Sequence, residues 1–224
     1  MNVRKTIFAN GELYHIFNRG IEKHPVFTSK KEYERAVLTL DYYRFKNPSL
    51  RLSKTLILNL ENREKFYTEL RNLSDKLVEI VVYCLMPNHF HFVLKQRLDN
   101  GISRFVSNFA NSYTRYFNTR HDKRTGALFQ GIFKAVHIED DDQLVHVARY
   151  IHINPAVSYV IEKDNLEKYE WSSYPEFLGL SKKEICDKDL VLKLFSSRKS
   201  FRKFVADQVD YARRLDKIKH LILE

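Results

Sequence analysis

The sequence has 224 residues with a formal net charge of +10, and 44% of its residues are hydrophobic, enough for a packed core. Six Gly and five Pro exclude a disordered or linker-rich chain, and two Cys exclude a disulfide scaffold or a four-cysteine zinc site. No signal-peptide core or run of 18 apolar residues occurs, so we expect a soluble cytoplasmic protein. The excess positive charge suggests a polyanionic partner, with nucleic acid as the first candidate.

The chain opens on a predicted strand followed by a helix. Residues 11–18 are apolar and aromatic enough for a strand, and a turn-like Asn-Arg-Gly follows them. Ser29 and Glu32 have the spacing of a capping box, which opens a helix that runs to about Phe45, just before an Asn-Pro pair.

A polar insertion and a hairpin come next. Residues 49–75 are predicted to be an insertion with a helix around 61–73. Residues 78–85 are rich in β-branched side chains, and residues 89–94 follow them after a short Met-Pro-Asn turn. These two strands are therefore expected to form a β-hairpin.

The second half alternates helix, strand and helix. Residues 102–118 have the apolar spacing of an amphipathic helix, and 131–138 form another expected strand. A helix over 140–154 should end where Pro155 follows its last turn, and 198–222 should be a last amphipathic helix. This order predicts an α+β domain with an antiparallel sheet, helices on one face and a helical C-terminal extension.

The segment Pro87-Asn-His-Phe-His-Phe92 is the first candidate for chemistry. Side chains alternate along a strand, so His89 and His91 should lie on one face while Phe90 points into the core. Two imidazoles one repeat apart can share a divalent metal, although such pairs also occur on surfaces without one.

The helix over 140–154 supplies the second candidate group. His146, Tyr150 and Asn154 follow one another at intervals of four residues and share one helix face. Tyr150 could serve as a nucleophile, and the Asn154 oxygen suits a hard cation such as Mg²⁺ or Mn²⁺. Taken alone, these residues are explained as well by structural roles, with Tyr150 a half-buried aromatic residue and Asn154 the residue that ends the helix.

The joint pattern resembles the REP-associated tyrosine transposases, which are single-tyrosine, HUH-type DNA transposases of small bacterial insertion sequences. The resemblance covers roughly residues 8–180 in the expected order, and four segments carry it: Tyr14-His-Ile-Phe-Asn-Arg-Gly20, Tyr83-Cys-Leu-Met-Pro-Asn-His-Phe-His91, Leu128-Phe-Gln-Gly131 and Arg149-Tyr-Ile-His-Ile-Asn-Pro155. It implies a ferredoxin-like (RRM-like) antiparallel sheet, the HUH endonuclease fold. Residues 1–180 would form the transposase domain and 181–224 the helical extension.

The resemblance also implies roles for single residues. His89, His91 and Asn154 would hold a divalent metal, Mg²⁺ or Mn²⁺, and Tyr150 would form a 5′-phosphotyrosine link to DNA. His146 could assist proton transfer, although a structural role explains it as well. The substrate would be single-stranded DNA beside a hairpin from an imperfect palindrome. The protein would be nucleoid-associated when bound to DNA. A homodimer is possible, and the sequence does not decide between monomer and dimer.

Basic residues that could contact DNA lie along the chain. Arg104, Asn108 and Arg115 share the polar face of the helix over 102–118, which favours them slightly. The candidates are Arg19, Arg104, Asn108, Arg115, Arg120, Lys123, Arg124 and Lys134. Two alternatives stay open: a hairpin DNA- or RNA-binding protein on an RRM-like sheet, and a family member that has lost cleavage. A zinc hydrolase is disfavoured because the chain has no His-Glu-x-x-His.

Overall fold

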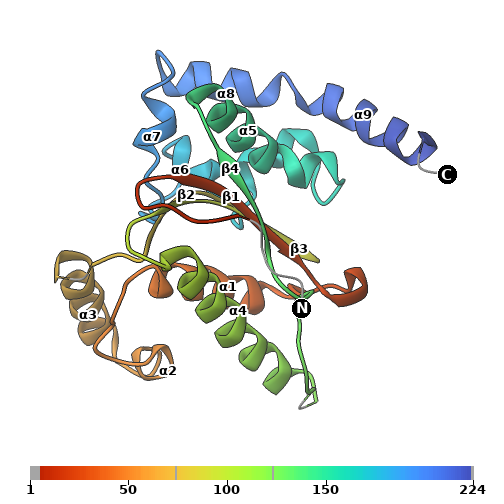
Figure 1. The fold of residues 1–224 in the computed structure, drawn as a ribbon. Coiled ribbons are helices and arrows are strands. Elements are labelled where there is room, and N and C mark those ends of the chain that lie inside the picture. Colours follow the sequence, from red (N-terminus) through yellow and green to blue (C-terminus); the bar gives the residue numbers. More distant parts are fainter. Residues whose placement is uncertain (1–5, 74, 123, 223–224) are drawn as a thin grey trace.

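The computed structural model describes residues 6–73, 75–122 and 124–222. A four-stranded sheet divides the molecule into two layers of helices (Figure 1). Its strands are β1 (Leu13–Arg19), β2 (Val78–Met86), β3 (His89–Gln96) and β4 (Lys134–Ile138). They lie in the order β2-β3-β1-β4, and every neighbouring pair is antiparallel.

Two helices cover one face of the sheet. They are α1 (Lys30–Tyr43), between β1 and β2, and α4 (Gly101–Arg120), between β3 and β4. The resulting βαββαβ order with antiparallel pairing is the ferredoxin-like arrangement, so the predicted fold class is confirmed. Phe90 and Phe92 of β3 are fully buried against Phe105 and Phe109 of α4, which anchors β3 from below.

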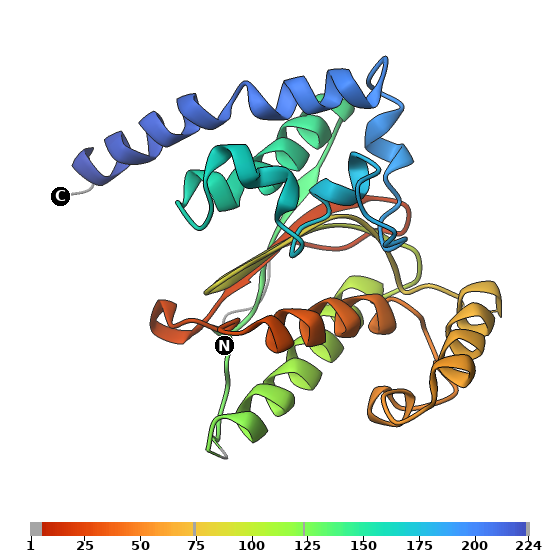
Figure 2. The same cartoon turned by 180° about the vertical axis from the view of Figure 1, so that it is seen from behind.

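The opposite face is covered as well, so the expectation of helices on one face is wrong. Figure 2 shows α5 (Asp141–Val157) on that side, with α8 (Arg198–Ala206) and α9 (Val209–Ile222) outside it. A second apolar core forms there because β2 is apolar on both faces: Ile80 and Tyr83 join the α1–α4 core, while Val82 and Cys84 join the core beneath α5.

Short elements complete the fold. The predicted insertion contains α2 (Leu52–Thr55) and α3 (Leu60–Leu73), and Leu52, Phe66 and Leu70 form a small core with the end of α1. The remaining elements are the 3₁₀ helices Ile21–Lys23 and Lys163–Lys168 and the helices α6 (Tyr174–Phe177) and α7 (Asp189–Leu192). Across the described ranges, no helix is both long and apolar enough to span a membrane.

The capping box predicted at Ser29 is not formed, although α1 does begin after it. Glu32 instead accepts hydrogen bonds from the backbone N–H and the hydroxyl of Thr28, at 2.7 and 2.8 Å. It also lies 2.8 Å from His121 Nε2, at the end of α4. The buried carboxylate is thus bound by Thr28, two residues before the helix, and by His121, just after α4, a pairing that local spacing cannot reveal.

Three other element boundaries differ from expectation. The strand predicted over 131–138 begins only at Lys134. Helix α5 continues past Pro155 to Val157, because a proline in a last turn removes a single N–H while Ser158 N still donates to Asn154 O at 2.9 Å. The helix predicted over 198–222 is broken at 207–208, and the bend lets Arg213 Nε donate to Ala156 O at 3.0 Å.

Candidate active site

The candidate site lies on the sheet face beneath α5. Residues opposite one another in an antiparallel sheet project to the same side. Arg19 is paired with His89, and Phe17 is paired with both His91 and Lys134. Three neighbouring strands therefore present a continuous row of polar and aromatic side chains to the helix that carries Tyr150.

The His89 ring is held by its neighbour in sequence. His89 Nδ1 lies 2.6 Å from Asn88 Oδ1, and because the amide oxygen can only accept, Nδ1 carries the proton. The lone pair of His89 is then on Nε2. The Asn154 side chain, on α5, lies close enough to offset part of the lowering of the His89 pKa, so β3 and α5 meet at this ring.

A second histidine holds His91. His15 Nε2, on β1, lies 2.9 Å from His91 Nδ1, and the two rings are nearly parallel with their centroids 5.2 Å apart. His15 was not among the residues predicted from the sequence, although it lies in the Tyr14–Gly20 motif. Alternation along β1 could have revealed it, because His15, Phe17 and Arg19 share one face.

Tyr150 lies over the histidine pair and faces solvent. Its ring meets the His91 ring edge-on at 5.5 Å and the His15 ring at 6.2 Å between centroids. The side chain is 50% exposed, whereas Asn154 one turn later is 7% exposed. The structure therefore brings together the four residues singled out as nucleophile and metal ligands: His89, His91, Tyr150 and Asn154.

Burial keeps the histidines of the site neutral. Removal from water lowers the pKa of His15 and of His89 to about 4, and the positive charge of Arg19 adds to this effect at His89. Burial also holds the pKa of His91 well below its usual value, with smaller contributions from His15 and His89. Neutral imidazoles are the form that ligates metals.

The donor set suits a divalent cation only if oxygen ligands complete it. Across residues 6–73, 75–122 and 124–222, no three His, Cys, Asp or Glu side chains gather into a possible metal site. His89 and His91 supply two neutral imidazoles, and Asn154 supplies an amide oxygen beside His89. This mixed set fits Mg²⁺ or Mn²⁺ when a phosphate or water provides the remaining oxygens.

A pocket of about 360 Å³ opens beside these residues. Arg19 and Lys134, two of the predicted DNA contacts, line it, so both stand beside Tyr150. Phe17, Gln130 and Ile132 also line it and were not predicted. Ile132 is 53% exposed, which leaves an apolar side chain in contact with water at the mouth of the site.

Other predicted residues lie elsewhere. Arg104, Asn108 and Arg115 are exposed on α4, on the far side of the sheet from Tyr150. His146 is exposed on α5, with its Nδ1 2.7 Å from Arg149 and its ring packed near Phe204. Arg124 donates to Asn118 and to the carbonyl of Ala127, Arg120 lies 5.8 Å from the Tyr116 ring, and Lys123 falls outside the described residues.

Comparisons with known proteins agree with this architecture. Residues 53–154 match the family model described as "Transposase IS200 like". A solved structure described as the "REP associates tyrosine transposase bound to a REP hairpin" aligns with a TM-score of 0.53 and 11% identity, covering 84% of this chain and 98% of that one. No curated protein sequence matches significantly. The family match covers strands and helices that carry the site, including Tyr150 and Asn154.

Proposed function

We propose that this chain, which is similar to IS200-like transposases over residues 53–154 and to a REP-associated tyrosine transposase in its fold, is a metal-dependent DNA endonuclease and strand transferase. Its substrate would be single-stranded DNA beside a hairpin, as the hairpin-bound neighbour suggests. The observation that carries the proposal is the half-exposed Tyr150 ring against His91, at the mouth of a pocket lined by Arg19 and Lys134.

The cleavage step assigns one task to Tyr150. Its phenol oxygen attacks the scissile phosphorus, the bond from phosphorus to the 3′-oxygen breaks, and a 5′-phosphotyrosine remains. The phenol loses its proton and the departing 3′-oxygen gains one. Because one phosphodiester replaces another, a second 3′-hydroxyl can attack the phosphotyrosine, rejoin the DNA and release Tyr150 without a nucleotide cofactor.

The other residues bind and orient the DNA. A divalent cation held by His89, His91 and Asn154 would supply Lewis-acid stabilisation of the phosphoryl oxygens. Asn88 holds the His89 ring with its lone pair on Nε2, and His15 contacts Nδ1 of the His91 ring from β1. Arg19 and Lys134 add positive charge where the phosphate would enter.

A covalent-adduct assay tests this proposal. A hairpin-flanked single-stranded oligonucleotide is incubated with the protein and Mg²⁺ or Mn²⁺, and denaturing gels resolve protein joined to DNA. We expect an adduct that is absent with chelator, absent in Tyr150→Phe and strongly reduced in His89→Ala. Tyr159→Phe is the matched control, because Tyr159 is a comparably exposed tyrosine (57%) just after α5.

Two results would contradict the proposal in different ways. An adduct that persists in Tyr150→Phe would overturn the assignment of the nucleophile. Tight hairpin binding without any adduct, at every divalent metal tried, would favour the alternative of a DNA- or RNA-binding protein that has lost cleavage.

A further inference from the structure

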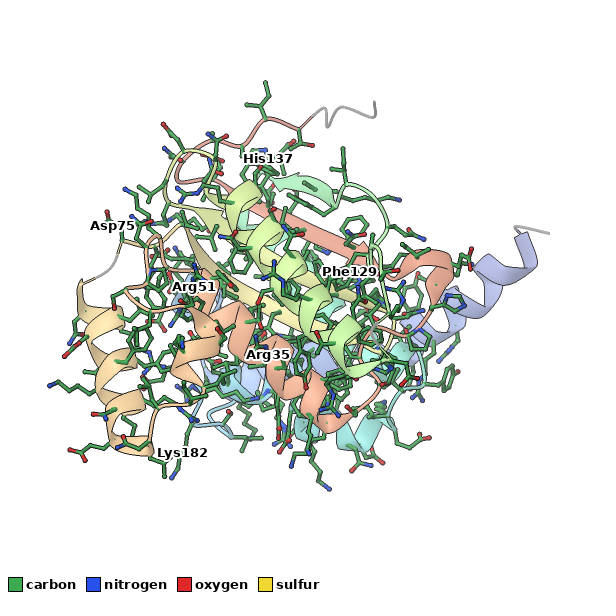
Figure 3. All side chains as sticks on the ribbon, turned by 90° about the horizontal axis from the view of Figure 1, so that it is seen from below. Arg35, Arg51, Asp75, Phe129, His137 and Lys182 are labelled. Carbon is green, nitrogen blue, oxygen red and sulfur yellow. The ribbon has the colours of Figure 1, made fainter. Side chains whose placement is uncertain are left out.

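A half-buried arginine lies on the face of the sheet opposite the candidate active site. Arg35 projects from α1, and Figure 3, which looks onto the α1–α4 layer, places it in the middle of that layer. Its Nε is buried and has no hydrogen-bond partner among the described residues, and its guanidinium lies 5.2 Å from the centre of the Tyr116 ring. Burial lowers the pKa of Arg35 below its usual value.

This arginine differs from Arg44, a buried arginine of the same helix layer. Arg44 follows α1 and is paired: it lies 2.8 Å from Asp41 and donates to Ile185 O at 2.6 Å. Arg35 has no carboxylate within ion-pair distance in the part of the chain that the structure describes. A partly desolvated guanidinium without a counter-ion is costly unless an anion binds to it.

The groups around Arg35 suit a ligand that carries negative charge and several hydrogen-bonding atoms, as a nucleic-acid backbone does. A groove of about 350 Å³ between α1 and α4 is lined by both arginine and amide side chains. The polar lining includes Arg35, Arg115, Asn108, Asn111 and Ser112, and neither Asp nor Glu contributes to it among the described residues. Arg115 is exposed beside Arg35, so two guanidiniums and several neutral hydrogen-bonding groups face one space.

One further pocket lies between this groove and the candidate active site and shares lining residues with both. The pocket beside Tyr150 shares Asn18, Gly131 and Ile132 with a second pocket of about 350 Å³ along α4. That second pocket shares Asn111 with the Arg35 groove. The three pockets are therefore neighbours, which lie in order from Tyr150, past the segment before β4, to Arg35.

We infer that the α1–α4 groove is a second DNA subsite, where Arg35 and Arg115 bind phosphates of the unpaired strand after it leaves the cleavage site. The inference rests on the proposed function for the identity of the strand. The middle pocket has apolar walls, with Val106, Leu128 and Phe129 among them, which suits bases. The Arg35 end is cationic and suits the backbone.

The test measures DNA affinity across a salt series. A fluorescent oligonucleotide with a hairpin and single-stranded flanks is titrated with full-length protein carrying Arg35→Gln, Arg115→Gln or, as a charge-matched control, the exposed Lys182→Gln. We expect each arginine variant to weaken binding on the order of tenfold. The slope of log affinity against log salt should fall by about 0.7 for each single-strand phosphate that a variant no longer neutralises. Lys182→Gln should change neither the affinity nor the slope.

The adduct assay separates failure of this inference from failure of the proposed function. If wild type forms the adduct but neither arginine variant changes affinity or salt slope, the second subsite is wrong and the catalytic proposal stands. If the arginine variants show the expected losses of affinity and salt slope but wild type forms no adduct, the second subsite is supported and the proposed catalytic activity is not. Because Arg115 is exposed, a loss in Arg115→Gln cannot be ascribed to misfolding, and circular dichroism checks Arg35→Gln.

Discussion

His15 Nε2 lies 2.9 Å from His91 Nδ1, across the pair of strands that forms the floor of the site. Both rings are neutral at pH 7 because burial lowers both pKa values, so only one proton lies between these nitrogens. If His91 donates it, His91 Nε2 keeps a lone pair for a metal. If His15 donates it, His91 Nε2 carries the other proton and cannot ligate.

We therefore expect His15 to position His91 for metal binding. His15→Ala should weaken Mn²⁺ affinity by about 10- to 100-fold, as the loss of an outer partner of a histidine ligand usually does. His15→Gln, which keeps an acceptor on the same strand, should recover part of the loss. Isothermal titration with Mn²⁺ measures the effect, and His24→Ala, at a largely exposed histidine, is the control. Equal affinities in wild type and His15→Ala would refute this role.

The side chain of Asn154 allows a separate test of the oxygen ligand. Asn154→Ala removes the amide oxygen and should reduce both Mn²⁺ affinity and adduct yield by about tenfold or more. Asn154→Asp keeps an oxygen and adds charge, so it should bind Mn²⁺ at least as well as wild type. Electron paramagnetic resonance of bound Mn²⁺ compares the two variants. Weaker binding in Asn154→Asp than in Asn154→Ala would argue against an oxygen ligand at this position.

Much of the fold could be predicted because its signals are local. Alternation along 89–94 placed His89 and His91 on one face and Phe90 in the core, and the structure confirms both placements. The spacing of four residues along α5 correctly brought Tyr150 and Asn154 to one side. In each case, side-chain direction follows directly from strand or helix geometry.

Features that depend on tertiary contacts were missed or mistaken. Glu32 has the spacing of a capping residue, yet it pairs with His121 because α4 ends beside α1. The contact between His15 and His91 requires the β1–β3 register, which a single sequence does not contain. Arg35 stands out only once the positions of the neighbouring carboxylates are known, because none in the described part of the chain pairs with it.

The packing of the C-terminal helices on the core leads to a prediction about stability. Phe201 of α8 is fully buried, and its ring lies 5.3 Å from Phe177 and 5.1 Å from Phe195 between centroids. Phe201→Ala should lower the free energy of unfolding by about 3–5 kcal/mol. Lys203→Ala, at an exposed position of the same helix, should change it by less than about 0.5 kcal/mol. Urea unfolding compares them, and a small loss in Phe201→Ala would show that residues after 181 contribute little to the core.

His152 gives stability a pH dependence that can be isolated. It projects from α5 and is fully buried, with its ring near those of Tyr174, Phe177 and Phe201 and its Nε2 2.8 Å from Ser173 Oγ. Burial lowers its pKa to about 3. In the unfolded chain a histidine titrates near ~6.5. Between these values the unfolded state takes up a proton that the folded state refuses, so stability falls as pH falls below about 6.5 and is unaffected by this group above it.

The other buried histidines contribute equally to the pH dependence of stability in wild type and in His152→Leu, so the difference between the two proteins isolates His152. Urea unfolding at pH 7, 6 and 5 should show wild type losing stability more steeply than the variant, by about 1 kcal/mol per pH unit below pH 6. The variant itself loses the hydrogen bond to Ser173, so it should be less stable than wild type at pH 7, and the gap should narrow on acidification. If the free energies of unfolding of wild type and His152→Leu fell in parallel with pH, His152 would be gaining a proton in the folded protein. The core beneath α5 would then admit water.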